Sequence, residues 1–130
     1  MIVGIGLDVV ELARMANILA GRSGSRFIDK VLTPGERKIW EGLPPRRAVE
    51  YASGRFAAKE AVVKALGCGI GAAVGFQDIE VLPDELGKPE CTLSPAAIAR
   101  LGWEGSGFRL HVAITHERSM AAATALIEKR

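Results

Sequence analysis

The chain has 130 residues and a formal net charge of +2, and 48% of its residues are hydrophobic. This length suits one domain with its own core, which we expect to comprise residues 1–130. Its two cysteines lack metal-ligand spacing, which argues against a zinc site or disulfide framework and favours a reducing, cytoplasmic setting. With no export signal, no membrane-spanning run and so mild a charge, we expect neither a membrane nor a nucleic acid as partner.

The first residues predict a buried strand followed by a helix. Residues 2–7 alternate apolar side chains with glycine, and Gly4 and Gly6 would let another backbone approach closely. From Val9 the apolar spacing becomes helical, so Asp8 is expected at the junction of strand and helix. Capping of that helix is the simplest interpretation of Asp8 from the residues alone.

Residues 14–30 form a basic strip that contains a single acid, Asp29. A turn-rich break at residues 21–25 divides the strip between two short helices. Its cations are Arg14, Arg22, Arg26 and Lys30, with Phe27 as an apolar neighbour. Both a solvated face and a docking surface for an acidic partner would explain this strip.

The centre of the chain predicts a long helix. Thr33-Pro34-Gly35-Glu36 has the pattern of a capping box and begins a short helix that reaches about Trp40. A second helical run continues without proline from Arg46 to a stop at Gly67. A helix of this length spans a small domain, so the other elements must wrap around it.

The second half of this long helix carries a cluster of charges: Arg55, Lys59, Glu60 and Lys64. Glu60 precedes Lys64 by four residues, the order that favours an ion pair on one helix face, and a surface ion pair is one interpretation. The other interpretation is that a carboxylate beside three cations binds a metal-bound phosphate ester.

The remainder of the chain predicts short strands and one further helix. Glycine-rich residues 67–71 follow a helix instead of a strand, so we interpret them as a loop and not as a dinucleotide-binding motif. We expect a hairpin from residues 76–82 and 88–93, a helix over 95–101, and an antiparallel pair from 108–115 and 120–127. His111 is expected to be structural or exposed, whereas His116 lies at a strand end, where functional groups protrude more readily.

The segment Phe56-x-x-Lys59-Glu60-x-x-x-Lys64 resembles the signature of the phosphopantetheinyl transferases. Further segments that fit this family are residues 4–11, 55–67, 76–81, 87–89 and 114–116. The chain is similar, nearly end to end, to the short single-domain type, the holo-acyl-carrier-protein synthases. This resemblance implies an α+β fold in which a small antiparallel sheet wraps around a long central helix.

The resemblance also implies a reaction. A serine hydroxyl of apo-acyl carrier protein would attack the β-phosphate of coenzyme A, giving holo-carrier protein and 3′,5′-ADP in fatty acid biosynthesis. Asp8 and Glu60 would bind Mg²⁺, Lys64 would steady the phosphate, and Glu60 or a metal-held water would take the serine proton. The residues implied to contact coenzyme A are Arg55, Lys59, Lys64, Gly87, Lys88, Pro89, Thr115 and His116.

Two further expectations concern partners. In this family the first-helix region docks an acidic carrier protein, which implies that role for Arg14, Arg22, Arg26, Phe27 and Lys30. The family's synthases are homotrimers with active sites between subunits, so we expect the same assembly here. A competing interpretation is a non-catalytic module that binds an acidic protein or a nucleic acid through these cations, but it leaves Asp8, Glu60 and Lys64 without a role.

Overall fold

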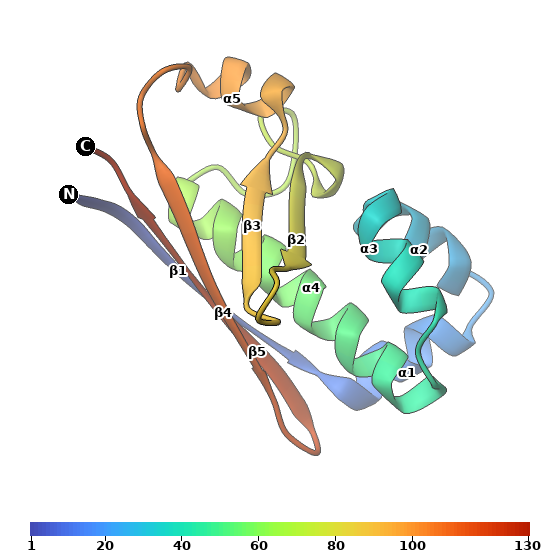
Figure 1. Ribbon diagram of the computed structural model, residues 1–130. Helices are drawn as coiled ribbons and strands as arrows, with labels where there is room; N and C mark the ends of the chain where they lie inside the picture. Colours follow the sequence, from blue (N-terminus) through green and yellow to red (C-terminus); the bar gives the residue numbers. More distant parts are fainter.

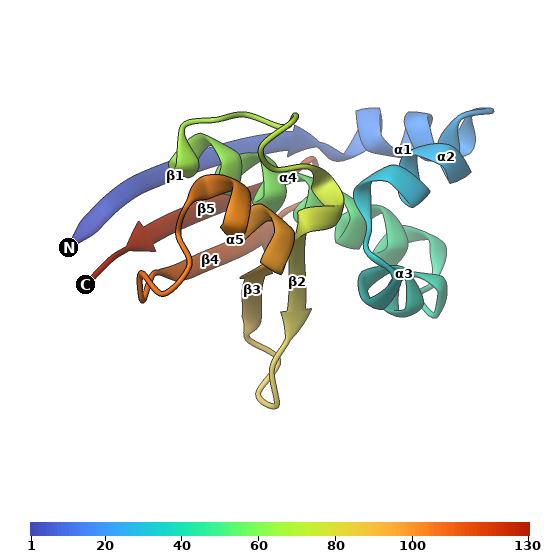
Figure 2. The same cartoon turned by 90° about the horizontal axis from the view of Figure 1, so that it is seen from above.

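Helix α4, Pro45–Leu66, is the longest element, and the other elements lie around it (Figure 1). The computed structural model describes residues 1–130. One side of α4 packs on an antiparallel sheet of strand order β1-β5-β4, made of Ile2–Glu11, Met120–Glu128 and Arg109–His116. A separate hairpin of β2, Ile79–Pro83, and β3, Pro89–Leu93, projects outwards beside the sheet (Figure 2). The expected α+β architecture around a central helix is therefore confirmed.

The remaining elements are short. They are α1 (Leu12–Ala20), α2 (Gly24–Val31), α3 (Pro34–Glu41), a 3-10 turn η1 (Phe76–Asp78) and α5 (Pro95–Leu101). The main core lies where α4 meets β5 and the hairpin, and a smaller core centred on Met15 and Ile28 joins α1 and α2 to α4. No helix is both long enough and apolar enough to cross a lipid bilayer.

Helix α4 packs unusually closely on strand β1 because the strand presents glycine to it. A Cβ atom on Gly6 would lie 1.9 Å from the carbonyl oxygen of Ala61, and one on Gly4 would lie 2.0 Å from that of Ala65. Any side chain at these positions would therefore force the helix away from the sheet. The predicted close approach is confirmed, and it brings Asp8, two residues after Gly6, beside α4.

Two expectations about β1 are wrong. The strand continues to Glu11 because its pairing with β5 continues to Met120, so Asp8 lies within the strand and does not cap α1. The first N–H of α1, that of Leu12, instead donates to the carbonyl of Ser119 at 2.9 Å. The strand is also not buried, because only its glycine face meets α4, and Ile5 on the opposite face is 71% exposed.

Three other predicted helix ends are confirmed. Thr33 and Glu36 form the capping box of α3, Ser94 accepts a hydrogen bond from Ala97 N–H at the start of α5, and Gly67 ends α4 with a left-handed φ of 80°. The expected strand from residue 76 begins only at Ile79, because residues 76–78 form η1.

A partly buried turn before β2 depends on Asp78. Its carboxylate accepts hydrogen bonds from Gly75 N–H at 2.8 Å, from the Ser94 hydroxyl at 2.6 Å and from the Arg100 guanidinium at 2.8 Å. Burial alone would raise the pKa of Asp78, but these hydrogen bonds and the Arg100 charge outweigh it and hold the pKa below its ordinary 3.8.

We therefore expect Asp78→Asn to lower the melting temperature by a few degrees near neutral pH. A depressed pKa gives stability that is complete above the unfolded-state pKa and is lost as the pH falls through the folded-state value. The difference between wild type and variant should thus shrink only below about pH 4. Thermal unfolding followed from pH 7 to pH 2.5 tests this, and a difference independent of pH would contradict it.

Candidate active site

Two carboxylates and a lysine meet where β1 packs on α4. Strand alternation turns Asp8 toward the helix, where Lys64 Nζ donates to Asp8 Oδ1 and to the Leu7 carbonyl, both at 3.0 Å. Burial raises the pKa of Glu60, the nearby Asp8 charge raises it further, and Lys64 opposes both. Lys64 forms its ion pair with Asp8, so the simple surface pair between Glu60 and Lys64 is not found.

These carboxylates lie in a groove of about 590 Å³. Asp8 and Glu60 form one part of its lining, and Arg14 and Phe27 form another. Its remaining lining residues are mostly apolar: Val9, Val10, Glu11, Met15, Ile18, Phe56 and Met120. The structure thus brings part of the basic strip to the carboxylate pair, a proximity that the sequence did not indicate.

The cations of the basic strip are exposed on α1, on α2 and on the turn between them. Arg14, Arg22, Arg26 and Lys30 form no ion pair within the chain. Phe27 is half-buried, and its ring centroid lies 5.7 Å from that of Phe56. No carboxylate of the chain pairs with these cations, so the surface that they form is positively charged.

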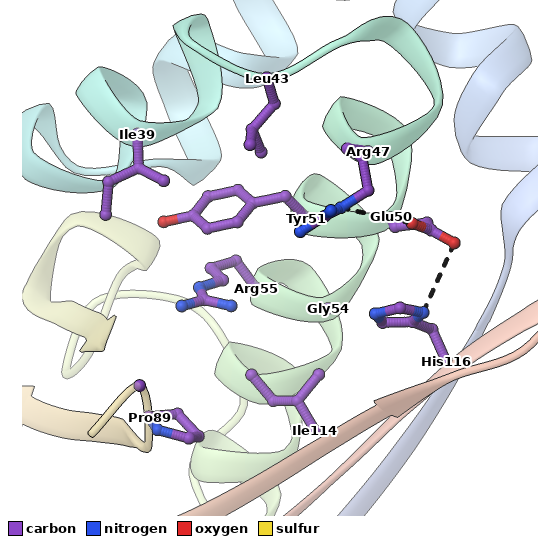
Figure 3. Close-up of a pocket in the computed structure, with 11 residues that line it drawn as sticks. Ile39, Leu43, Arg47, Glu50, Tyr51, Gly54, Arg55, Pro89, Ile114 and His116 are labelled. Atoms are coloured by element: carbon purple, nitrogen blue, oxygen red, sulfur yellow. Dashed lines mark ion pairs between the residues drawn. The ribbon is translucent and has the colours of Figure 1, made fainter. Parts of the chain in front are cut away.

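A second pocket, of about 350 Å³, lies between the amino-terminal half of α4, α3, the hairpin turn and the end of β4 (Figure 3). The Arg55 guanidinium carbon lies 4.2 Å from the ring centroid of Tyr51, and Arg55 Nε donates to the Val81 carbonyl at 3.3 Å. His116 Nδ1 lies 3.5 Å from Glu50 Oε2. The Tyr51 hydroxyl oxygen is buried and has no hydrogen-bond partner.

This pocket gathers only some of the residues expected to contact coenzyme A. Arg55, Gly87, Pro89 and His116 line it, whereas Lys88 is exposed on the hairpin turn outside it. Thr115 lies opposite Ala122 on the exposed face of the sheet, the face that points away from α4. Adjacent strand residues point to opposite faces, so Thr115 and His116 are separated.

The expectation that Lys59 contacts coenzyme A is not supported, because Lys59 is completely buried. Its three N–H donors already have acceptors: the Val31 carbonyl and Glu36 Oε1, each at 2.6 Å, and the Phe76 carbonyl at 3.0 Å. Burial lowers the pKa of Lys59, while the Glu36 charge raises it. Lys59 thus forms hydrogen bonds in the protein interior, where a phosphate cannot reach it.

The comparisons with known proteins agree over nearly the whole chain. Residues 4–125 match the family model described as the 4′-phosphopantetheinyl transferase superfamily. The chain belongs to this family. A holo-[acyl-carrier-protein] synthase from Magnetococcus marinus is 46% identical over 130 residues, which cover 98% of this chain and 94% of the relative.

Two solved structures of family members are similar throughout. The holo-[acyl-carrier-protein] synthase of Neisseria meningitidis has a TM-score of 0.87 at 38% identity, covering 99% of this chain and 100% of that one. The Bacillus anthracis synthase, solved in complex with coenzyme A (3′,5′-ADP), has a TM-score of 0.84 at 39% identity, covering 100% and 99%. The fold is therefore that of this transferase family.

The carboxylate pair of this phosphopantetheinyl transferase fits a magnesium ion. Mg²⁺ takes oxygen ligands, commonly one or two carboxylates, with substrate phosphate and water completing its coordination. The two carboxylates line one groove, the Asp8 charge helps to raise the pKa of Glu60, and Lys64 already places a cation on Asp8. The site has no third His, Cys, Asp or Glu that could complete an all-protein metal cage. This donor set suits a metal shared with a phosphate substrate.

The sequence analysis missed three polar residues of the second pocket: Arg47, Glu50 and Tyr51. Arg47, Tyr51 and Arg55 are spaced by four, so they lie along one helix face. That spacing was a usable signal for the second pocket of the transferase. Glu50 also lies beside His116, which comes from a distant strand, so no local pattern could reveal that contact.

Proposed function

We propose that this chain transfers the phosphopantetheine group of coenzyme A to a serine of an acyl carrier protein, releasing 3′,5′-ADP. The observation that carries the proposal is the Asp8, Glu60 and Lys64 cluster, found in a chain that matches named holo-[acyl-carrier-protein] synthases from end to end. Carrier proteins modified in this way serve fatty acid biosynthesis. A non-catalytic basic module would leave this cluster unexplained.

Within this reaction, Asp8 and Glu60 would hold Mg²⁺, which neutralises charge on the diphosphate. Lys64 extends from the same helix and is 53% exposed, so its ammonium is free to turn from Asp8 to a phosphate oxygen. The serine proton would pass to Glu60 or to a water held beside it. The raised pKa of Glu60 is compatible with its accepting a proton. Direct transfer to Glu60 and transfer through the water both require the Glu60 carboxylate at this position.

The second pocket suits the nucleotide end of coenzyme A. It combines two arginines, Arg47 and Arg55, with His116 and with the backbone of the hairpin turn. Guanidinium groups bind phosphates through paired N–H donors, so this pocket supplies positive charge where the 3′-phosphate and diphosphate need it. Two free thiols, Cys68 and Cys91, are compatible with the cytoplasm, where we infer that the reaction takes place.

A test of the transfer itself uses purified chain, apo-acyl carrier protein and coenzyme A. We expect the mass of the carrier protein to increase by one phosphopantetheine group only when Mg²⁺ is present. Intact-protein mass spectrometry, with a chelator-treated sample as control, reads the result directly. Unchanged carrier protein under all conditions would overturn the proposed activity.

The complete site would lie between subunits of a homotrimer. The groove of Asp8 and Glu60 and the pocket of Arg55 and His116 share no lining residue, so one chain does not join them in a single cavity. The outer face of β1 exposes a row of apolar side chains: Val3, Ile5, Leu7 and Val9. A continuous apolar strand face of this kind indicates contact with another protein surface. Packing of identical chains through it would bring the two half-sites of neighbouring copies together.

We expect Ile5→Glu to dissociate the assembly and to reduce activity in proportion. A charge placed in an apolar interface is costly to bury, so the variant should sediment as a monomer at assay concentration. Leu86→Glu is the matched control, because Leu86 is 93% exposed on the hairpin turn, away from β1. A fully active wild-type monomer, or a trimeric Ile5→Glu variant, would contradict this assembly.

We expect reversal of charge at Arg22 and Arg26 to weaken docking of the carrier protein. Arg14 lines the carboxylate groove, so Arg22→Glu/Arg26→Glu separates docking from chemistry more cleanly. The KM for carrier protein should rise about tenfold and depend less on salt, with the KM for coenzyme A unchanged. Arg109→Glu/Arg130→Glu, at the start of β4 and just after the end of β5, controls for net charge. Steady-state kinetics in which only coenzyme A parameters change would show that the docking surface is misplaced.

A further inference from the structure

The carboxyl end of α2 is closed by side chains from other elements. A helix leaves its last four carbonyl groups without partners inside the helix. Counted to Leu32, the residue that caps α2, these are the carbonyls of residues 29–32. The side-chain Nε2 of Gln77 has two N–H donors and lies within hydrogen-bond distance of three of them, those of Leu32 (2.7 Å), Asp29 (3.0 Å) and Lys30 (3.3 Å). The remaining carbonyl, that of Val31, accepts from Lys59 at 2.6 Å. Donors from outside α2 therefore reach all four carbonyls, with the two N–H groups of Gln77 shared among three of them.

These contacts connect α2 to the helix that carries Glu60. Lys59 precedes Glu60 on α4, and its Nζ also donates to the Phe76 carbonyl in η1 at 3.0 Å. Aromatic contacts connect the same elements: the ring centroid of Phe56, on α4, lies 5.7 Å from that of Phe27, on α2, and 5.6 Å from that of Phe76, in η1. Helix α2 is therefore joined to α4 both through its carboxyl end and through its aromatic face.

We propose that Gln77 is a positioning residue for the carrier protein. By closing α2 it fixes the direction in which Arg26 and Lys30 face relative to Glu60, so that a docked carrier presents its serine to the carboxylate pair. This inference rests on the proposed docking role of the basic strip. Gln77 itself is exposed, belongs to η1 and lines neither the carboxylate groove nor the second pocket.

The other polar contacts of α2 do not replace this one at its carboxyl end. The exposed ion pair between Arg37 and Asp29 also reaches α2, but exposed pairs contribute little to holding an element in place. Lys59 satisfies one carbonyl only, and its other protons are committed to Glu36 and Phe76. Loss of the Gln77 amide therefore leaves three carbonyls to water and loosens the end of α2 that bears Lys30.

The test uses Gln77→Met, which keeps the length of the side chain and removes both N–H donors. We expect the KM for acyl carrier protein to rise about fivefold, the size expected for the loss of one or two hydrogen bonds. The KM for coenzyme A and kcat at saturating carrier protein should stay at wild-type values, and the salt dependence should not change because every cation is retained.

Gly102→Ala is a control variant that should lose about as much stability as Gln77→Met. Gly102 ends α5 with a left-handed φ of 71° and has no atom within 4 Å of its Cβ position, so alanine there strains the backbone far from α2. It should lower the melting temperature like Gln77→Met without changing the KM for carrier protein. The inference is overturned if Gln77→Met lowers the melting temperature without changing the KM for carrier protein. It is also overturned if the KM for carrier protein and the KM for coenzyme A rise equally.

The same kinetic series separates this inference from the docking role of the strip. If Arg22→Glu/Arg26→Glu raises the KM for carrier protein and Gln77→Met does not, docking stands and the positioning role is overturned. If neither variant changes that KM, both are overturned. A rise with Gln77→Met alone would support the positioning role and place the docking contact on α2 residues other than these arginines.

Discussion

Asp8→Asn and Glu60→Gln should each lower the rate of phosphopantetheine transfer by at least about a hundredfold while leaving the chain folded. Both replacements are close in size to the native side chains and remove the negative charge that a magnesium ion requires. Asp8 is also the ion-pair partner of Lys64, so its loss frees an exposed lysine and leaves no buried charge unpaired. The fold should therefore survive, although the reaction does not.

The measurement is transfer rate as a function of Mg²⁺ concentration, together with thermal unfolding of each variant. If weak metal binding causes the loss, a large excess of Mg²⁺ should restore part of the activity of Glu60→Gln. Glu104→Gln, which removes an exposed carboxylate in the loop after α5, should behave as wild type. Near wild-type rates for both active-site variants at limiting Mg²⁺ would show that the metal assignment is wrong.

Local signals in the sequence predicted the elements of this fold well. The capping box at Thr33, the stop at Gly67 and the glycines of β1 each act within a few residues, so the pattern and the structure agree. The exceptions depended on distant partners. Asp8 was expected to cap a helix, but β5, more than a hundred residues later, extends the strand through it.

For the candidate site, too, some features could be predicted from local patterns and others could not. Helical spacing predicted that Glu60 and Lys64 share a helix face, and only the family resemblance implied that Asp8 joins them. The structure places the three together. The signature did not reveal which side of α4 each charge faces. Lys59 and Glu60 are adjacent in the sequence, yet one lies in the interior and the other in the groove, because successive residues are about 100° apart around a helix.

The interior position of Lys59 predicts the largest effect on stability in the chain. We expect Lys59→Met to lower the free energy of unfolding by about 3–5 kcal/mol, the cost of leaving one member of a buried ion pair without its partner. The carboxylate of Glu36 is also fully buried, and it accepts from Thr33 N–H at 2.8 Å and from Val81 N–H at 2.7 Å. These two hydrogen bonds would remain in the variant, but they do not neutralise the charge.

A double variant separates the charge from the packing. Glu36→Gln/Lys59→Met removes both charges while keeping side chains of similar size, so it should recover a large part of the stability lost in Lys59→Met. Urea unfolding of wild type, both single variants and the double variant gives the coupling energy between Lys59 and Glu36. If the effects of the single variants simply add, the ion pair does not hold α3 to α4, and the stability must come from the packing around it. If the double variant is more stable than Lys59→Met, the contact between Lys59 and Glu36 is electrostatic: each charge is destabilising in the interior when the other is removed.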